Sequence, residues 1–201
     1  STTTDSTPPS IVYLTPAEGQ VFANTTDSVT IEVNVTDDGT GVSAANVSVF
    51  FDGVDVTANA DTSNLSAVTY TATALAPGTS HTVAVVASDD ADNSRVERRN
   101  FSIAPDTSPP TVTLSALNTT LTEGTTLPAG SSTFDVTLSY ADDAAGVNAS
   151  SVAVRFDGQR LSNASDATLL ASNDTATVVR VSDLANGSTH TVAVSLADAA
   201  G

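Results

Sequence analysis

The chain contains no lysine, cysteine, methionine or tryptophan. Its six basic residues, all arginines, stand against 23 acidic ones, and the formal net charge over 201 residues is -17. No basic patch is available to neutralise phosphates or anionic lipids, so we expect no nucleic acid partner and no acidic membrane surface. Without cysteine there are no disulfides, thiolate zinc sites or cysteine nucleophiles, and packed cores must hold the fold together.

Long apolar segments are also missing. No run of about 18 apolar residues and no secretory signal layout is present, which predicts no direct membrane insertion in this segment. We therefore expect a mature product or an excised piece of a longer chain.

What the sequence does contain is a tandem repeat, seen as landmarks that recur in the same order. The pairs are Asp5-Ser-Thr-Pro8-Pro9 with Asp106-Thr-Ser-Pro109-Pro110, Asp37-Asp38-Gly39-Thr40-Gly41-Val42 with Asp142-Asp143-Ala144-Ala145-Gly146-Val147, Phe51-Asp52-Gly53 with Phe156-Asp157-Gly158, and His81-Thr-Val83-Ala-Val85 with His190-Thr-Val192-Ala-Val194. The repeat predicts two domains, residues 1–105 and 106–201, joined near Ala104 to Ser108.

Within each repeat, apolar and polar residues alternate, as in half-buried strands. In the first repeat we expect strands at 11–15, 20–24, 28–36, 46–52, 67–74, 80–88 and 95–103. Long helical periodicity is absent, so we predict an all-β protein of antiparallel sandwiches. The alternation also turns Phe50 outward, either as an ordinary surface aromatic or as a contact with a neighbouring subunit.

The order "DxxPP", "DDGxGV", "FDGVDV", "LAPGTSHTVAVVASDDADN" and "FSI" resembles the tandem immunoglobulin-like or fibronectin type III-like modules of bacterial and archaeal surface and secreted proteins. The resemblance covers essentially the whole chain and implies two immunoglobulin-like antiparallel β-sandwiches in tandem. It implies little chemistry, because such modules serve as stalks, spacers, shell tiles and adhesive tips.

The second repeat stops at Ala197–Gly201, where the first continues through residues 93–103 and gains a last strand. We therefore expect the second sandwich to lack its final strand. A chain that continues past Gly201 is the plainer explanation. The alternative is donor-strand complementation by a neighbouring subunit.

Asparagine usage predicts a secreted glycoprotein. Ten of the twelve asparagines begin an Asn-x-Ser/Thr triplet without proline, whereas a serine and threonine content of roughly 28% gives three or four by chance. These candidate N-glycan acceptors are Asn24, Asn34, Asn46, Asn64, Asn100, Asn118, Asn148, Asn163, Asn173 and Asn186.

Aspartates are expected to gather at one pole of each sandwich, where the entry segment, the second-to-third strand turn and the last hairpin meet. In the first repeat the candidates include Asp5, Asp37, Asp38, Asp89, Asp90 and Asp92, and in the second Asp106, Asp142, Asp143 and Asp198. Calcium prefers such oxygen ligands, so it is the candidate ion; no other cofactor is expected. Solvated turn carboxylates are the alternative, and no complete EF-hand loop is present.

His81 and His190 hold equivalent positions at the start of the sixth strand. We expect structural roles for both, with the ring packed and one nitrogen bonded to nearby backbone. A Ser-His-Asp triad picked from the sequence is no evidence for catalysis without geometry. Paired carboxylates in one turn do not span the cleft that a glycosidase needs. Aromatic side chains on which sugars could stack are scarce. We therefore expect no enzyme.

The acid surplus suits high salt, because molar salt shortens the Debye length to about 3 Å and screens self-repulsion. Together with the dense sequons and the missing lysine, it resembles haloarchaeal extracellular glycoproteins of the surface-layer or surface-filament type. We expect a non-enzymatic segment of a cell-surface assembly, with other copies of itself or neighbouring domains as partners. The alternatives are an accessory stalk of a secreted enzyme and an adhesive or receptor-binding module.

Overall fold

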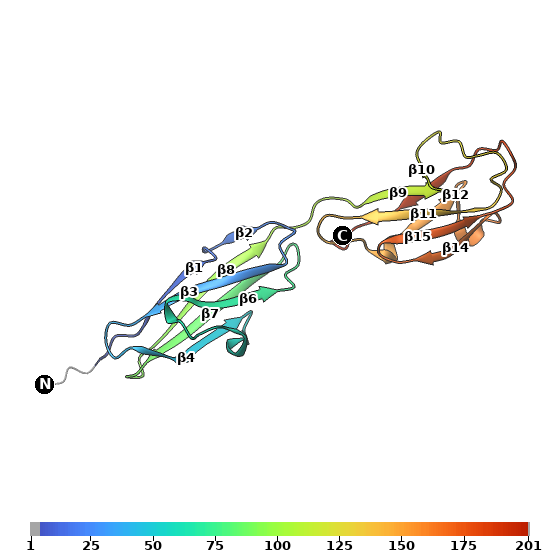
Figure 1. Ribbon diagram of the computed structural model, residues 1–201. Helices are drawn as coiled ribbons and strands as arrows, with labels where there is room; N and C mark the ends of the chain where they lie inside the picture. The colour runs from blue at the N-terminus through green and yellow to red at the C-terminus, as the bar shows by residue number, and fades with distance from the viewer. Residues whose placement is uncertain (1–4, 201) are drawn as a thin grey trace. The chain divides into compact units, whose positions relative to one another are not determined.

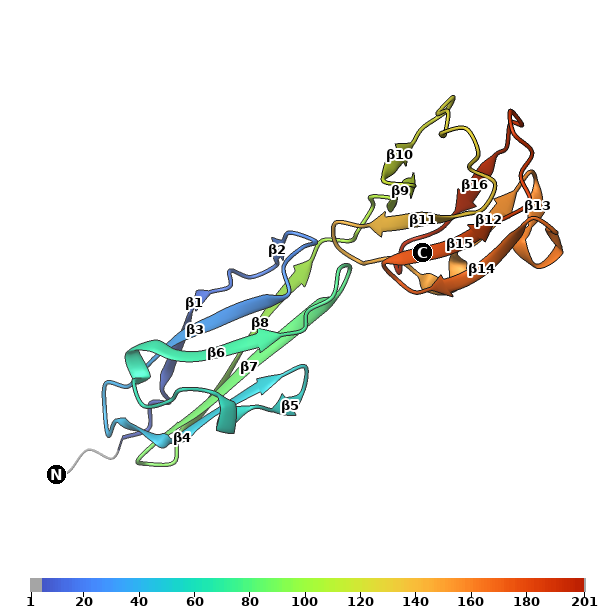
Figure 2. The ribbon, with the colours of Figure 1, turned by 45° about the vertical axis from the view of Figure 1, so that its right-hand side comes forward.

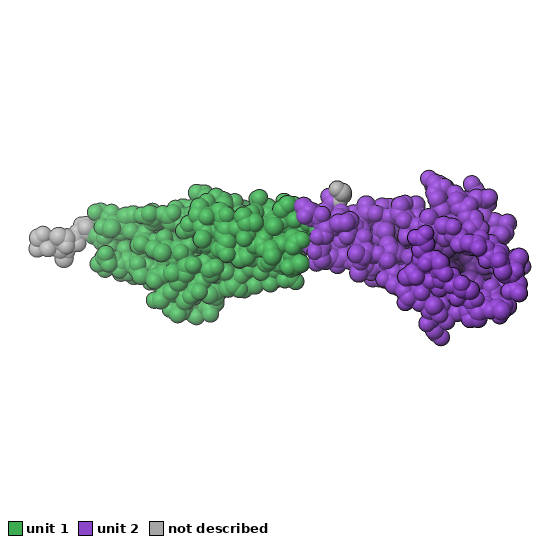
Figure 3. Space-filling model, turned by 90° about the horizontal axis from the view of Figure 1, so that it is seen from above, with its two compact units in different colours: residues 1–106 green, residues 107–201 purple. Residues whose placement is uncertain are grey.

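The computed structural model describes residues 5–200 of the chain (Figure 1). The chain divides into two compact units, Ser1–Asp106 and Thr107–Gly201, coloured separately in Figure 3. Both units are built almost wholly of strands joined by turns, with four short 3-10 helices in the described part.

The first unit is a sandwich of two sheets. Its strands are β1 (Ser10–Thr15), β2 (Gln20–Phe22), β3 (Ser28–Thr36), β4 (Val42–Phe51), β5 (Val54–Asp55), β6 (Val68–Thr73), β7 (Ser80–Asp89) and β8 (Ser94–Ile103), with 3-10 helices η1 (Thr57–Asn59) and η2 (Leu65–Ala67). One sheet has the order β1-β3-β6 and the other the order β2-β8-β7-β4-β5. All pairs are antiparallel except β2 with β8, which is parallel.

Strand alternation builds the core of the first unit. In β3, Val29, Ile31, Val33 and Val35 are 1–5% exposed, while the residues between them face outward. The facing sheet supplies Val83, Val85 and Ala87 from β7 and Phe101 and Ile103 from β8, all at most 2% exposed. β8 therefore supplies part of the buried face of the larger sheet.

The second unit also has eight strands in two sheets, but they are grouped differently. It contains β9 (Thr111–Ala116), β10 (Thr119–Leu121), β11 (Phe134–Ala141), β12 (Ala153–Phe156), β13 (Gln159–Arg160), β14 (Ala167–Ser172), β15 (Ala176–Val181) and β16 (Val192–Ser195), with 3-10 helices η3 (Ala149–Ser151) and η4 (Leu161–Asn163). Its sheets have the orders β10-β9-β11-β15-β14 and β13-β12-β16 (Figure 2).

The two cores differ in size. Among the described residues, the core cluster of the first unit has 17 buried members and that of the second has eight. Val192, Val194 and Leu196, the counterparts of Val83, Val85 and Ala87, are only half-buried. Within residues 5–200 no strand follows β16, so the smaller sheet stops where β8 continues in the first unit.

These observations confirm the all-β expectation and the tandem immunoglobulin-like sandwiches. All seven strands expected in the first repeat are present, with ends that shift by a few residues; β4, for example, begins at Val42. Sequence reasoning missed β5, which pairs with β4 across a two-residue turn. Asp52 and Gly53 form that turn with φ of 49° and 82°, both in the left-handed region that Asp-Gly hairpins use.

Candidate functional site

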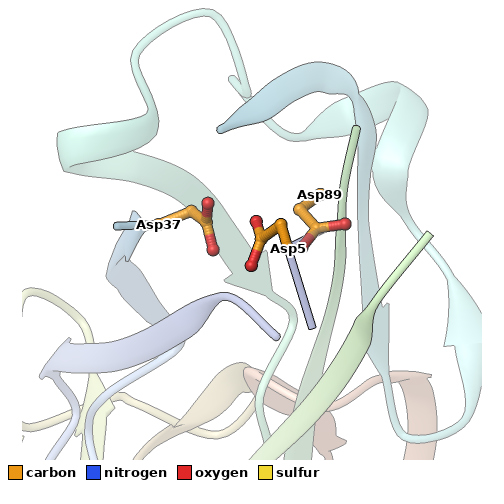
Figure 4. A group of neighbouring side chains, drawn as sticks. All are labelled: Asp5, Asp37 and Asp89. Carbon is orange, nitrogen blue, oxygen red and sulfur yellow. The ribbon is translucent and has the colours of Figure 1, made fainter. Parts of the chain in front are cut away.

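Three aspartates of the first unit meet at one end of the sandwich. Asp5 precedes β1, Asp37 lies in the turn between β3 and β4, and Asp89 ends β7. One carboxylate oxygen from each lies within 4.8 Å of the other two. Figure 4 shows the carboxylate of Asp5 between those of Asp37 and Asp89. Oxygen-only groups of this kind suit a hard cation such as calcium.

Backbone donors hold each carboxylate in place. The N–H groups of Gly39 and Gly41 donate to Asp37 Oδ2 at 2.8 and 2.9 Å. Asp89, which is 1% exposed, accepts from Ala91 N and Asn93 N on Oδ1. For Asp5, the hydrogen bond from Thr7 N, followed by those from Thr40, lowers the pKa of the carboxyl group below its usual value. The hydrogen bonds thus favour the ionised form of Asp5 and hold the carboxylates of Asp37 and Asp89 in a fixed orientation.

One oxygen of this group has no hydrogen-bond partner. Asp37 Oδ1 is buried yet unpaired within the described structure, while its Oδ2 accepts two hydrogen bonds. In the second repeat Asp142 shows the same pattern: Oδ2 accepts from Ala144 N and Gly146 N, and Oδ1 is buried and unpaired. Because buried polar atoms are nearly always satisfied, the recurrence of this orphan oxygen indicates a missing partner.

The remaining aspartates predicted for the two poles are distributed as follows. Asp106, Asp142 and Asp198 form a second group with ligand oxygens within 4.8 Å. The groups do not include Asp38, Asp90 and Asp143, which are exposed. Sequence reasoning did not single out Asn93, whose Nδ2 donates to Asp89 Oδ2 at 2.7 Å and to the Asp5 carbonyl at 3.4 Å. The only signal for it was its place in the "DDADN" run of the first repeat.

Each unit also carries a hydroxyl-histidine-aspartate chain. His81 Nδ1 lies 2.8 Å from Asp52 Oδ2, and His81 Nε2 lies 2.7 Å from Thr79 Oγ1. In the second unit, His190 Nδ1 lies 2.7 Å from Asp157 Oδ2 and Nε2 lies 2.6 Å from Ser188 Oγ. The imidazole of His81 stacks on Phe51, and that of His190 on Phe156, with centroids 5.2 and 5.3 Å apart.

The packed rings agree with a structural role, but the expected backbone partner is replaced by two side chains. The Asp-Gly turn explains the difference, since it brings the aspartate beside the start of the strand that pairs with β4 or β12, namely β7 in the first unit and β16 in the second. Asp157 Oδ1 also accepts from Thr191 N at 2.7 Å. Burial raises the pKa of Asp157, and the hydrogen bonds from His190 and Thr191 outweigh it, so that the net shift is downward.

These chains resemble a catalytic triad in connectivity only. Ser188 Oγ donates to the Ala185 carbonyl at 2.6 Å, and Thr79 Oγ1 donates to the Ala76 carbonyl at 2.6 Å. A hydroxyl has one hydrogen, so in this arrangement it cannot also donate to the imidazole, as a nucleophile must. In the first unit these hydrogen bonds connect the Asp-Gly turn after β4, the start of β7 and the loop that precedes β7.

The sequons occupy accessible positions. Eight of the ten asparagines are exposed, and Asn24 and Asn34 are half-buried. In Asn64, Asn148 and Asn173, Oδ1 accepts from the backbone N–H of the sequon serine or threonine at 3.1, 3.1 and 2.9 Å. These bonds use Oδ1 and not Nδ2, the atom to which an N-glycan is attached.

Phe50 is half-buried and lines a shallow apolar depression on the β4, β7 and β8 face of the first unit. Ala84, Val86 and Val96 form most of its floor, and Arg98 contributes the one charged side chain among the lining residues. Among the described residues, no helix is long and apolar enough to cross a membrane.

Comparison with known proteins supports the fold. Residues 9–85 match the family model for the bacterial Ig domain. The first unit is similar to bacterial Ig domains. A search of curated proteins found no match. Immunoglobulin-like domains of this kind fit a structural or adhesive module.

Solved structures give weaker similarities. A Bacteroides ovatus protein, SGBP-B of a mixed-linkage glucan utilization locus, is 14% identical with a TM-score of 0.33; the match covers 93% of this chain, which spans 65% of that protein's length. The N-terminal Ig1-2 module of the Drosophila receptor protein tyrosine phosphatase DLAR is 10% identical with a TM-score of 0.38, covering 97% of this chain and 93% of the module. Similarities of this size carry no argument about function.

Proposed function

We propose that this chain is a non-enzymatic structural segment of a glycosylated haloarchaeal cell-surface assembly, either a surface layer or an extracellular filament. Its immunoglobulin-like units act as rigid spacers and as contacts between subunits. The observation that carries the proposal is the coincidence of tandem sandwiches with ten sequons, none of which has a buried asparagine. Sugars on these positions leave both cores intact and keep the outer surface hydrated, as an extracellular location requires.

The acid surplus supports the same environment. With 23 acidic and six basic residues on a chain of 20.2 kDa, self-repulsion destabilises the compact state in dilute solution. Molar salt removes most of that repulsion, because it screens exposed charges beyond about 3 Å. A protein with this surface is suited to a hypersaline exterior.

Glycopeptide mass spectrometry of the protein from its native source tests the glycan part. We expect added sugar on several sequons, with Asn148 and Asn173 among them because both are exposed and present Nδ2 unbonded by their turns. Asn59 and Asn93, the two asparagines outside sequons, are the internal controls and should be unmodified. Ten bare sequons would refute the glycoprotein proposal.

Electron tomography of the native cell surface with antibodies against this chain tests the assembly. Labelling that follows an ordered sheet or a filament supports a structural role. Labelling that follows a soluble particle with hydrolase activity would instead favour the accessory stalk of a secreted enzyme. Labelling confined to contacts with another cell or a virus would favour the adhesive module.

We further propose that the group of Asp5, Asp37 and Asp89 binds calcium. The unpaired, buried Oδ1 of Asp37, repeated at Asp142, favours a cation over a simple cluster of solvated turn carboxylates. Asp5 and Asp89 supply the other carboxylate ligands, and the backbone donors around them hold these side chains in place.

The neighbouring aspartate provides a matched test. Asp37→Asn removes a ligand oxygen, whereas Asp38→Asn removes the same charge from an exposed position outside the group. We expect calcium at about 100 times its dissociation constant to stabilise the wild type and the Asp38→Asn variant by about 2.7 kcal/mol, and Asp37→Asn by clearly less. Equal stabilisation of both variants, or none of the wild type at molar salt, would refute the site.

A further inference from the structure

One face of the first unit combines an apolar depression with N-glycan acceptors. The depression lies over β4, β7 and β8, which are adjacent in the larger sheet (Figure 2), and Phe50, Ala84, Val86 and Val96 are its apolar lining residues. Val96 is 45% exposed, and the other three are half-buried. Apolar side chains that are contiguous, and not scattered singly, indicate a contact surface.

Strand register arranges the depression as two rows across the sheet. In one row Phe50 of β4 lies opposite Ala84 of β7, which lies opposite Arg98 of β8. In the next row Val86 of β7 lies between Ser48 of β4 and Val96 of β8. The apolar residues are therefore neighbours on the outer side of one sheet.

Two sequon asparagines lie in the rows on either side of these two. Asn46 of β4 is exposed and stands two residues before Ser48, on the same side of the strand, because Val47 between them is 1% exposed. Asn100 of β8 lies opposite Thr82, a lining residue of the depression. A sugar on either asparagine therefore begins beside the depression, at opposite ends of it.

The amide of Asn100 is held in one orientation and is still available for a sugar. Thr82 Oγ1 donates to Asn100 Oδ1 at 2.8 Å, and Asn100 Nδ2 donates to Glu18 Oε1 at 3.0 Å. Because Nδ2 carries two hydrogens, one can be replaced by a sugar while the other keeps its bond to Glu18.

The second repeat lacks both the sequon and the apolar side chains at these positions. The counterparts of Asn46, Phe50 and Val86 in the repeat are Ser151, Arg155 and Ser195. The strand framework is nevertheless the same, since Arg155 lies opposite Ala193 as Phe50 lies opposite Ala84. The sequon and the apolar patch are thus present together in one unit and replaced together in the other, which connects the sugar with the patch.

We propose that N-linked sugars on Asn46 and Asn100 fold back over the depression and cover Phe50. This inference rests on the proposed glycosylation and adds a contact surface for the sugar. Sugar rings present C–H groups on their faces and hydroxyls at their edges. The apolar lining residues pack against the C–H groups, and the N–H donors of Arg98 reach the hydroxyls at the margin.

Hydroxyl-radical footprinting of the full chain, purified with its sugars as a monomer, measures the exposure of Phe50. Asn46→Gln combined with Ser102→Ala removes both sequons and keeps the hydrogen bonds of the Asn100 amide. Oxidation of Phe50 should be at least about two-fold faster in this variant, because a ring packed against a sugar has one of its two faces covered. Leu14, which is 54% exposed on the other sheet, should be oxidised at an unchanged rate.

Ser66→Ala is the matched control. It removes the sequon of Asn64 and keeps the turn at that residue, because Asn64 Oδ1 accepts from the backbone N–H of Ser66. The oxidation rate of Phe50 should remain that of the wild type.

Phe50→Arg tests the same contact from the side of the protein, since it introduces the residue that the second repeat carries. Loss of both sugars should lower the melting temperature of the first unit by several degrees when Phe50 is present and leave it unchanged in Phe50→Arg. Equal shifts in the two backgrounds would show that the sugars stabilise the unit without contacting Phe50, and would overturn the proposal.

Glycopeptide analysis separates this inference from the proposed glycosylation. A bare Asn46 or Asn100 beside other occupied sequons overturns the inference alone, as does equal oxidation of Phe50 with and without sugars on both. Ten bare sequons overturn the inference and the glycosylation together. Protection of Phe50 in the native surface assembly but not in the glycosylated monomer would assign the depression to a neighbouring subunit and would also overturn the inference.

Discussion

Phe101→Ala in β8 measures what a last strand contributes to a sandwich of this kind. The Phe101 side chain is 2% exposed and lies among three rings, with centroids 5.7 Å from Phe22, 6.3 Å from Phe51 and 5.4 Å from His81. Truncation to alanine removes the ring from all three contacts. It leaves the backbone pairing of β8 with β7 and β2 in place, so the side-chain contribution is isolated.

The expected loss is about 3–5 kcal/mol in the free energy of unfolding of the first unit, the usual cost of Phe→Ala in a core. For a domain of this size that corresponds to a fall of roughly 15–30 °C in its melting temperature. Phe101→Leu keeps most of the apolar volume and should cost about 1 kcal/mol. The ratio of the two variants separates lost packing from any disturbance of the strand itself.

Hydrogen exchange resolved by peptide is the suitable assay, because it reports the two units separately. The amides of β3 and β7 should lose about two to three decades of protection in Phe101→Ala, at about 1.4 kcal/mol per decade. A loss below about 1 kcal/mol would show that β8 contributes little through this side chain. The inference that β8 completes the core of the first unit through Phe101 would then fail.

Three further outcomes follow from the structure. Tyr13→Phe should cost the first unit about 1–2 kcal/mol in urea unfolding, because the hydroxyl lies 3.1 Å from both the Val83 and the Glu97 carbonyl, which share its one hydrogen. Asp157 has a lowered pKa in the folded state, so its stabilising effect is full above the ordinary aspartate pKa of 3.8 and declines as pH falls through the folded value. Asp157→Asn should flatten the pH dependence of unfolding in that range. Dialysis from molar to low salt should unfold much of the chain, as read by circular dichroism, and retention of full sandwich structure would contradict adaptation to salt.

Much of the fold follows from alternation alone. The run Val29, Ile31, Val33 and Val35 predicts a strand with one buried face, and the structure has it as β3. A period of two fixes which residues face the core, but it does not identify the neighbouring strand. For this reason the sequence could not show that β10 pairs with β9, whereas its counterpart in the first repeat, β2, pairs with β8.

The sites show a similar limit. Topology was enough to expect aspartates at one pole, since turn residues at one end of a sandwich lie close together. It could not separate Asp37, which faces Asp5, from Asp38, which is exposed one residue later, because side-chain direction in a turn depends on local φ and ψ. The partners of His81 were missed because Asp52 reaches it only through the left-handed Asp-Gly turn.

The two repeats together show which features depend on the last strand. The hydroxyl-histidine-aspartate chain occurs in both units with nearly equal distances, and so does the unpaired aspartate oxygen, so neither requires β8. What changes is the exposure of the core beside β16 and the pairing of β10. Within residues 107–200 the second unit thus keeps the turns and the hydroxyl-histidine-aspartate chain of the first unit, although its smaller sheet ends at β16.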